Sequence, residues 1–120
     1  MKKYSVLMVD LKSSRSYNIQ DRNNIQNTIL NSIKILNKIF KNSIEKEVEF
    51  SAGDEIQGLF ISPQSAYLYY RFFSMLIFPI QTHTGIGFGT WDIRVNSGSS
   101  TAQDGTVYHY ARKAIDEAKN

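Results

Sequence analysis

The chain has 120 residues, which fits one domain, because ordinary domains hold about 100–150 residues. Its 42% hydrophobic and 12% aromatic residues, with charges of both signs, are typical of a globular protein and exclude a disordered chain. There is no cysteine, so disulfides and thiolate metal sites are excluded. The net charge of +3 suits anionic ligands but lacks the dense Lys/Arg stripe expected of a protein that binds duplex nucleic acid.

The apolar run that precedes Asp10 is too short for a signal peptide. The longest apolar stretch, around residues 72–80, is interrupted by Ser74 and Pro79 and falls short of the roughly 20 residues of a membrane span. We therefore expect a cytoplasmic protein with no membrane association and no stable binding of duplex nucleic acid.

The first two elements follow from runs of apolar residues. Residues 4–9 are apolar and rich in strand formers, which predicts a buried strand that stops at Asp10. A polar connection over residues 12–16 follows. From about Asp21 apolar residues recur every three or four positions, which predicts a helix of roughly five turns with Asp21 as its cap or first-turn acid. These apolar positions are Ile25, Ile29, Ile33, Leu36 and Phe40.

A hairpin and a second helix are predicted next. Residues 45–51 alternate between apolar and charged side chains, the turn signal Gly53-Asp54 follows, and residues 55–61 form the partner strand. Pro63 suits the first position of a helix, which then continues to about Pro79. Further along, the sequence predicts a strand over residues 81–91 and a last helix over residues 106–119.

The order of these elements indicates an α+β fold, a ferredoxin-like βαββαβ palm domain in which an antiparallel sheet carries helices on one face. In this arrangement the first and third strands are antiparallel neighbours. The end of the first strand then lies beside the start of the third, so Asp10 is expected next to Gly53, Asp54 and Glu55. This convergence of acids is the central prediction.

Carboxylates held so close together repel one another unless a cation neutralises them. Mg²⁺ takes oxygen ligands and is usually bound by one or two carboxylates plus substrate phosphates. We therefore predict that Asp10 and Asp54 bridge Mg²⁺ or Mn²⁺, with the backbone of Leu11 as a further ligand and Glu55 assisting. The alternative is structural, because aspartates commonly end strands and Gly-Asp is a routine hairpin turn.

Phosphate contacts are predicted around these acids. Backbone N–H groups and hydroxyls of Ser13 and Ser14 could cradle phosphates, with Lys12 or Arg15 supplying positive charge. Gly53 would let the hairpin backbone approach the ligand closely.

Two later features have open interpretations. Gly85 and Gly87 belong to a strand with glycine at every second position, which indicates either close packing of a helix or a bare floor for a nucleobase. Arg112, on the last predicted helix, could reach the phosphates, although a lone helix arginine is more often solvated.

Four ordered motifs resemble the SatD family, and together they span nearly the whole chain. They are Val9-Asp10-Leu11-Lys12-Ser13-Ser14-Arg15, Ala52-Gly53-Asp54-Glu55-Ile56-Gln57-Gly58-Leu59, Gly85-Ile86-Gly87, and Asp104-Gly105 with Tyr108 and Ala111-Arg112-Lys113-Ala114-Ile115. That family is similar to the palm or nucleotide-cyclase fold of class III cyclases, GGDEF diguanylate cyclases and the polymerase subunit of type III CRISPR systems. By this resemblance Asp10 takes the place of the metal aspartate on strand one.

The resemblance implies a metal-dependent nucleotidyltransferase that makes a cyclic di- or oligonucleotide from ATP or another nucleoside triphosphate. A palm of this length is similar to the minimal CRISPR polymerases, which implies a role in antiphage defence. A homodimer is expected because a single palm must present two nucleotides. One alternative is a SatD-type regulatory or sensor domain that binds nucleotide without turnover. Another is a nucleic-acid-binding domain like the RRM, which we rank last because the predicted central strands offer few exposed aromatic residues.

Overall fold

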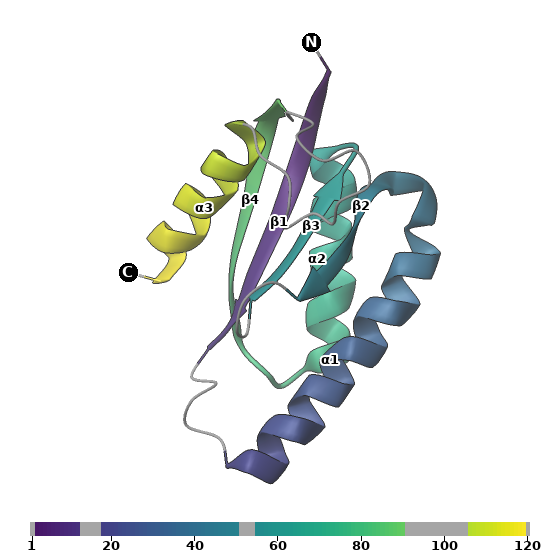
Figure 1. Cartoon of the computed structure of the whole chain (residues 1–120), viewed down its shortest axis with the longest axis vertical. Coiled ribbons are helices and arrows are strands. Elements are labelled where there is room, and N and C mark those ends of the chain that lie inside the picture. The colour runs from purple at the N-terminus through teal and green to yellow at the C-terminus, as the bar shows by residue number, and fades with distance from the viewer. Residues whose placement is uncertain (1, 13–17, 51–54, 91–105, 120) are drawn as a thin grey trace.

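The computed structural model describes residues 2–12, 18–50, 55–90 and 106–119. In chain order they form β1 (Lys3–Leu11), α1 (Ile19–Ile39), the short 3₁₀ helix η2 (Lys41–Ser43), β2 (Ile44–Phe50), β3 (Glu55–Phe60), α2 (Pro63–Ile77), β4 (Thr82–Thr90) and α3 (Thr106–Lys119). The predicted α+β class and the βαββαβ order with a final helix are confirmed (Figure 1). No helix in these described ranges is long and apolar enough to cross a membrane.

The helix starts follow local capping chemistry. The side chain of Asn18 accepts a hydrogen bond from the backbone N–H of Asp21 at 2.8 Å, so Asn18 is the cap of α1 and Asp21 is its first-turn acid. Ser62 caps α2 by accepting from the N–H of Ser65, and Pro63 takes the first helical position as predicted.

The four strands form one antiparallel sheet in the order β2-β3-β1-β4. β1 therefore lies between β3 and β4, as Figure 1 shows. The predicted pairing of the first and third strands is confirmed. β1 also continues one residue past Asp10, to Leu11, because Leu11 still pairs with Thr82 of β4.

Alternate residues of β1 pack on opposite faces of the sheet. Leu7, Val9 and Leu11 join the core beneath α1 and α2, whereas Val6 and Met8 join a second core beneath α3. The prediction of helices on one face of the βαββαβ unit is confirmed by α1 and α2. The final helix, α3, follows that unit and covers the opposite face.

The glycines of β4 explain why α3 can pack there. A Cβ atom on Gly87 would lie 2.3 Å from the backbone nitrogen of Ala111, and one on Gly85 would lie 2.4 Å from that of Ile115. Only glycine allows the backbones of β4 and α3 to approach so closely. The interpretation of Gly85 and Gly87 as a bare nucleobase floor is therefore wrong, because the α3 backbone occupies that space. The helix-packing alternative is correct.

Candidate active site

One end of the sheet gathers acidic and basic side chains from several elements. β1 ends there, and its antiparallel neighbours β3 and β4 begin there. Asp10 is the direct partner of Glu55 on β3 and of His83 on β4. Residues directly opposite each other share a face of the sheet, so these three form a row across three strands, which we call the acidic row. The predicted proximity of Asp10 to the start of the third strand is confirmed at Glu55.

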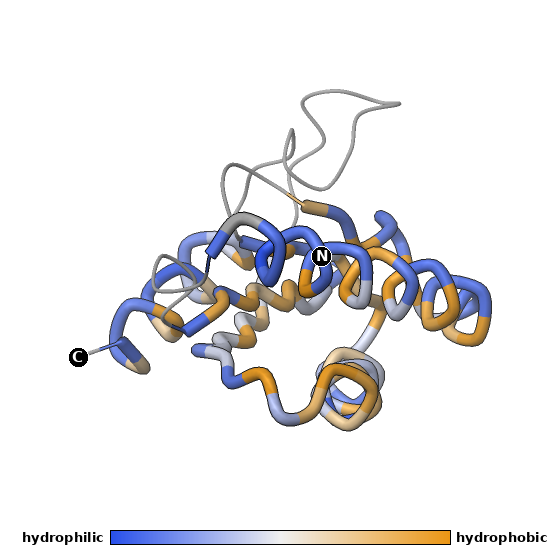
Figure 2. Tube along the Cα trace, turned by 90° about the horizontal axis from the view of Figure 1, so that it is seen from below, coloured by the Kyte–Doolittle hydropathy of each residue, from blue (hydrophilic) through white to orange (hydrophobic). Residues whose placement is uncertain are grey.

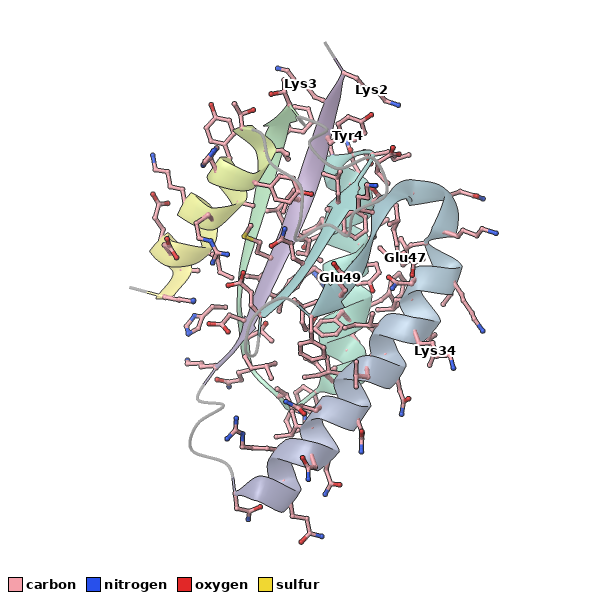
Figure 3. All side chains as sticks on the ribbon, in the orientation of Figure 1. Lys2, Lys3, Tyr4, Lys34, Glu47 and Glu49 are labelled. Carbon is pink, nitrogen blue, oxygen red and sulfur yellow. The ribbon has the colours of Figure 1, made fainter. Side chains whose placement is uncertain are left out.

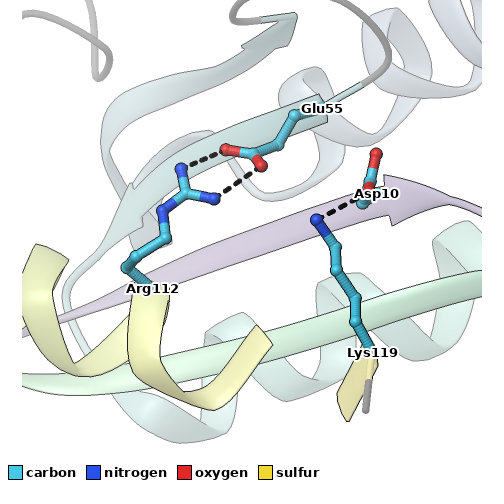
Figure 4. Close-up of polar contacts among 4 residues, drawn as sticks. All are labelled: Asp10, Glu55, Arg112 and Lys119. Atoms are coloured by element: carbon cyan, nitrogen blue, oxygen red, sulfur yellow. Dashed lines mark hydrogen bonds and ion pairs between the residues drawn. The ribbon is translucent and has the colours of Figure 1, made fainter. Parts of the chain in front are cut away.

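Two cations of α3 bind the two carboxylates of the acidic row (Figure 4). Arg112 donates from Nη1 to Oε2 of Glu55 at 2.7 Å and from Nη2 to Oε1 at 2.5 Å, a bidentate pair. Lys119 Nζ lies 2.9 Å from Oδ2 of Asp10. The site therefore lies on the face of the sheet that α3 covers, and α3 supplies its positive charge.

Each carboxylate of the acidic row is neutralised by a cation whose own side chain is partly exposed to solvent. The hydrogen bond to Glu55 raises the pKa of Arg112, and the charges of Glu55, Asp116 and Asp10 add to this effect, so the guanidinium stays protonated. The Arg112 side chain is 46% exposed and the Lys119 side chain 36%. The carboxylates are less exposed, at 13% for Glu55 and 25% for Asp10, so a ligand that displaces either cation has to bring a positive charge of its own, as a metal ion does.

Several predicted site residues cannot be placed from the structure. Asp54 and Gly53, together with Ser13, Ser14 and Arg15, lie outside the described residues. In the sequence they come directly before Glu55, the first residue of β3, or directly after Lys12. Lys12 is held in place because its backbone N–H donates to the carbonyl of Gln81. The side chain of Leu11 is buried in the core beneath α1 and α2, which leaves its backbone as the part available to a ligand.

Asp10 and Glu55 offer the oxygen ligands that Mg²⁺ prefers, but these two carboxylates alone do not complete a metal site. No group of three or more His, Asp or Glu side chains suited to a metal ion is found among the described residues. Asp10 and Glu55 provide oxygen ligands from two carboxylates, the number that proteins commonly use for Mg²⁺ that also binds substrate phosphates. A metal-nucleotide complex is thus compatible with these residues if Lys119 releases Asp10 and Arg112 releases Glu55.

A groove of about 940 Å³ opens next to the acidic row. Its walls include Lys12 after β1, Arg71 and Tyr70 of α2, and His83 at the start of β4. This volume is in the range of small-molecule sites, and its cations and aromatic ring suit an anionic ligand with a flat ring. Ten of its twelve lining residues lie between Tyr70 and His83, and Lys12 and Ala118 complete the walls. Sequence analysis missed the groove because its shape depends on how this stretch packs against the ends of β1 and α3.

The sequence model of the SatD family matches residues 4–120. The chain belongs to the SatD family. The resemblance seen in the four motifs is thereby confirmed. A comparison with curated protein sequences finds no match.

Solved structures similar to this SatD-family chain include nucleotide cyclases. A bacterial light-regulated adenylyl cyclase has a TM-score of 0.68 at 13% identity, over 98% of this chain and 71% of its own. The adenylyl cyclase CyaB from P. aeruginosa has a TM-score of 0.62 at 16% identity, over 97% and 72%. The diguanylate cyclase SiaD from Pseudomonas aeruginosa, solved with its activator SiaC, has a TM-score of 0.63 at 12% identity, over 98% and 46%. At such identities the likeness shows the fold, which is the palm fold of nucleotide cyclases.

Proposed function

We propose that this SatD-family chain is a metal-dependent nucleotidyltransferase that joins nucleoside triphosphates, with ATP favoured, into a cyclic di- or oligonucleotide. The observation that carries the proposal is the pairing of Asp10 with Glu55 at the end of a sheet whose fold is shared with adenylyl and diguanylate cyclases. Action in the cytoplasm as part of antiphage defence belongs to the same proposal.

Asp10, the Leu11 carbonyl and Asp54 would hold Mg²⁺ or Mn²⁺, with Glu55 beside them. When bound, the ion neutralises the triphosphate and acidifies the attacking hydroxyl. In the reaction a 3′-hydroxyl would lose its proton to water while its oxygen forms a bond to the α-phosphorus, the bond from that phosphorus to the bridging oxygen breaks, and pyrophosphate leaves.

The basic residues of the site are assigned to the phosphates. Arg112 already presents two parallel N–H donors to a carboxylate, and the same fork can bind a phosphate in its place. Lys12 and Arg15 supply further charge, while Ser13, Ser14 and Gly53 offer backbone contacts. Gly85 and Gly87 have no part in this assignment, since they pack against α3.

A second candidate function is a nucleotide sensor without turnover. The observation that favours it is that a cation of α3 binds each of the two carboxylates of the acidic row, which balances their charge without any metal. In such a sensor, ligand binding would exchange these contacts and no bond would be made.

The test is incubation of the purified protein with radiolabelled ATP, GTP, CTP and UTP plus Mg²⁺ or Mn²⁺. Asp10→Asn and Asp54→Asn proteins run beside it, and products are resolved by chromatography and mass. A phosphatase-resistant product and pyrophosphate that are both lost in the variants are expected of the transferase. Metal-dependent binding of a nucleotide without any product would support the sensor instead.

A further inference from the structure

The outer surface of α1 and α2 exposes large apolar side chains on the side of the sheet opposite the acidic row. We call this surface the apolar face, and it comprises Ile35, Ile39, Leu68, Phe72, Met75 and Leu76, whose side chains are between 46% and 69% exposed. α2 is apolar on two sides, because Tyr69, Phe73 and Ile77 on its other side are buried against the sheet. The tube coloured by hydropathy shows orange positions along both helices (Figure 2). A second apolar side that is not buried in the core of its own chain commonly marks an interaction surface.

The extent of the apolar face matches one side of a protein interface. Six large side chains that are each about half exposed present on the order of 600 Å² of apolar area. The largest apolar patch of an ordinary monomer reaches about 300–600 Å², and a stable interface covers about 800 Å² per partner once its polar rim is included. The apolar face is thus large enough to form the centre of such an interface.

Its shape and charge fit a second copy of the same surface. A hollow of about 220 Å³ lies between α1 and α2, lined by Leu36, Phe40 and members of the apolar face. Ile39 and Met75 are the most exposed members and stand beside that hollow. In a two-fold interface the same surface of each copy meets the other. A surface that has both projecting side chains and a hollow can therefore fit a second copy of itself.

The nearby cations argue against a lipid surface as the occupant. Lys34 and Lys38 of α1 line a different groove, together with Glu45 and Glu47 of β2. Figure 3 shows Lys34 on α1, with Glu47 on β2. An anionic membrane is attracted by several cations around the apolar side chains. Here Lys34 and Lys38 share their groove with carboxylates, and Arg71, which lines the other groove with Met75, donates to the Tyr67 hydroxyl.

We propose that a second copy of this chain packs on the apolar face, with α1 and α2 of one copy against α1 and α2 of the other. The two sheets would then lie outside a central layer of helices. Because the acidic row lies on the α3 side of the sheet, the interface would leave its carboxylates uncovered, whereas Met75 also lines the groove beside His83, so that one wall of the groove would border the interface. This dimer differs from the homodimer expected from the sequence, which was to bring two nucleotides together, and the inference goes beyond the proposed function because it concerns assembly and holds or fails without any turnover.

Sedimentation velocity of the full chain without nucleotide tests the proposal. The wild type is expected to sediment as a dimer of the 13.7 kDa chain. Ile39→Glu and Leu76→Glu should raise the dimer dissociation constant about 100-fold or more, because the two-fold axis buries each new charge twice. Tyr110→Glu is the matched control, since Tyr110 is 55% exposed on α3 and should leave the dimer intact. Circular dichroism confirms that each variant is folded.

Cross-linking locates the interface independently. The chain has no cysteine, so Ile39→Cys and Tyr110→Cys each give one thiol for a bifunctional maleimide. Covalent dimers are expected from Ile39→Cys and not from Tyr110→Cys. A monomeric wild type, or a dimer that survives both glutamate substitutions, would overturn the proposal. Binding of a monomer to anionic vesicles would also overturn it and would assign the apolar face to a membrane.

Discussion

Asp10 and Glu55 lie directly opposite each other on β1 and β3, and each carboxylate is bound by a different cation of α3. Arg112 and Lys119 are seven residues apart, which places them on the same side of that helix. α3 therefore does two things at the candidate site. It covers one face of the sheet, and it neutralises the acids expected to bind a metal.

Removing the cation on Asp10 should strengthen metal binding. Lys119→Gln is expected to bind Mn²⁺ about fivefold more tightly, roughly 1 kcal/mol, because one positive charge leaves the neighbourhood of the carboxylate. Electron paramagnetic resonance of free Mn²⁺ measures this. Lys113→Gln is the control, since it removes the same charge from an exposed position of α3. Equal affinities in the two variants would show that Lys119 does not compete with the metal.

The bidentate pair of Arg112 and Glu55 should make a small, salt-sensitive contribution to stability. A double-mutant cycle with Arg112→Ala and Glu55→Gln is expected to give a coupling of about 0.5–1 kcal/mol in urea unfolding at low salt. The coupling should shrink in about 1 M NaCl, where charges are screened. A cycle that pairs Arg112→Ala with Glu45→Gln on β2 should give none. Equal coupling energies in the two cycles would show that the contact between Arg112 and Glu55 does not form in solution.

The close packing of β4 on α3 predicts a large effect from one methyl group. Gly87→Ala should lower the free energy of unfolding by about 3 kcal/mol, because the new Cβ meets the backbone of α3, which cannot move without repacking. Gly58→Ala meets chiefly the Val48 side chain and should cost less. Chemical denaturation compares the two. A neutral Gly87→Ala would mean that α3 does not pack on this strand.

Tyr108 and Tyr69 should respond oppositely to loss of their hydroxyls. Burial, followed by the Glu49 charge, raises the pKa of Tyr108, so its hydroxyl stays protonated, yet it has no hydrogen-bond partner among the described residues. Tyr69 donates to Asn37 Oδ1 at 2.9 Å. Tyr108→Phe should therefore be neutral or stabilise by about 1 kcal/mol, whereas Tyr69→Phe should destabilise by about 1 kcal/mol. Thermal unfolding of both variants measures this, and destabilisation by Tyr108→Phe would reveal a partner for that hydroxyl.

Much of the fold could be predicted because each element carries its own local signal. The alternation in β2, the three-and-four spacing in α1 and the Ser62-Pro63 start of α2 all act within a few residues. The pairing of Asp10 with Glu55 then followed from the strand order that this succession of elements favours.

The position of α3 could not be predicted in the same way. Gly85 and Gly87 indicate only that something approaches the strand closely, and a helix and a nucleobase satisfy that requirement equally. The ion pairs of Arg112 and Lys119 depend on this position, so they were missed as well. Residues seven apart lie on the same side of a helix. With α3 placed over the sheet, this spacing of Arg112 and Lys119 would have indicated that both can reach the acids Glu55 and Asp10.

The most direct test of the central claim, that the acidic end of the sheet binds a metal-nucleotide complex, is calorimetric titration with ATP in the presence and absence of Mg²⁺. The account predicts Mg²⁺-dependent binding by the wild type that Asp10→Asn weakens by tenfold or more, about 1.4 kcal/mol or greater. Glu45→Gln, an exposed carboxylate on β2, should bind like the wild type. Binding that is independent of Mg²⁺, or equally strong in Asp10→Asn, would contradict the claim.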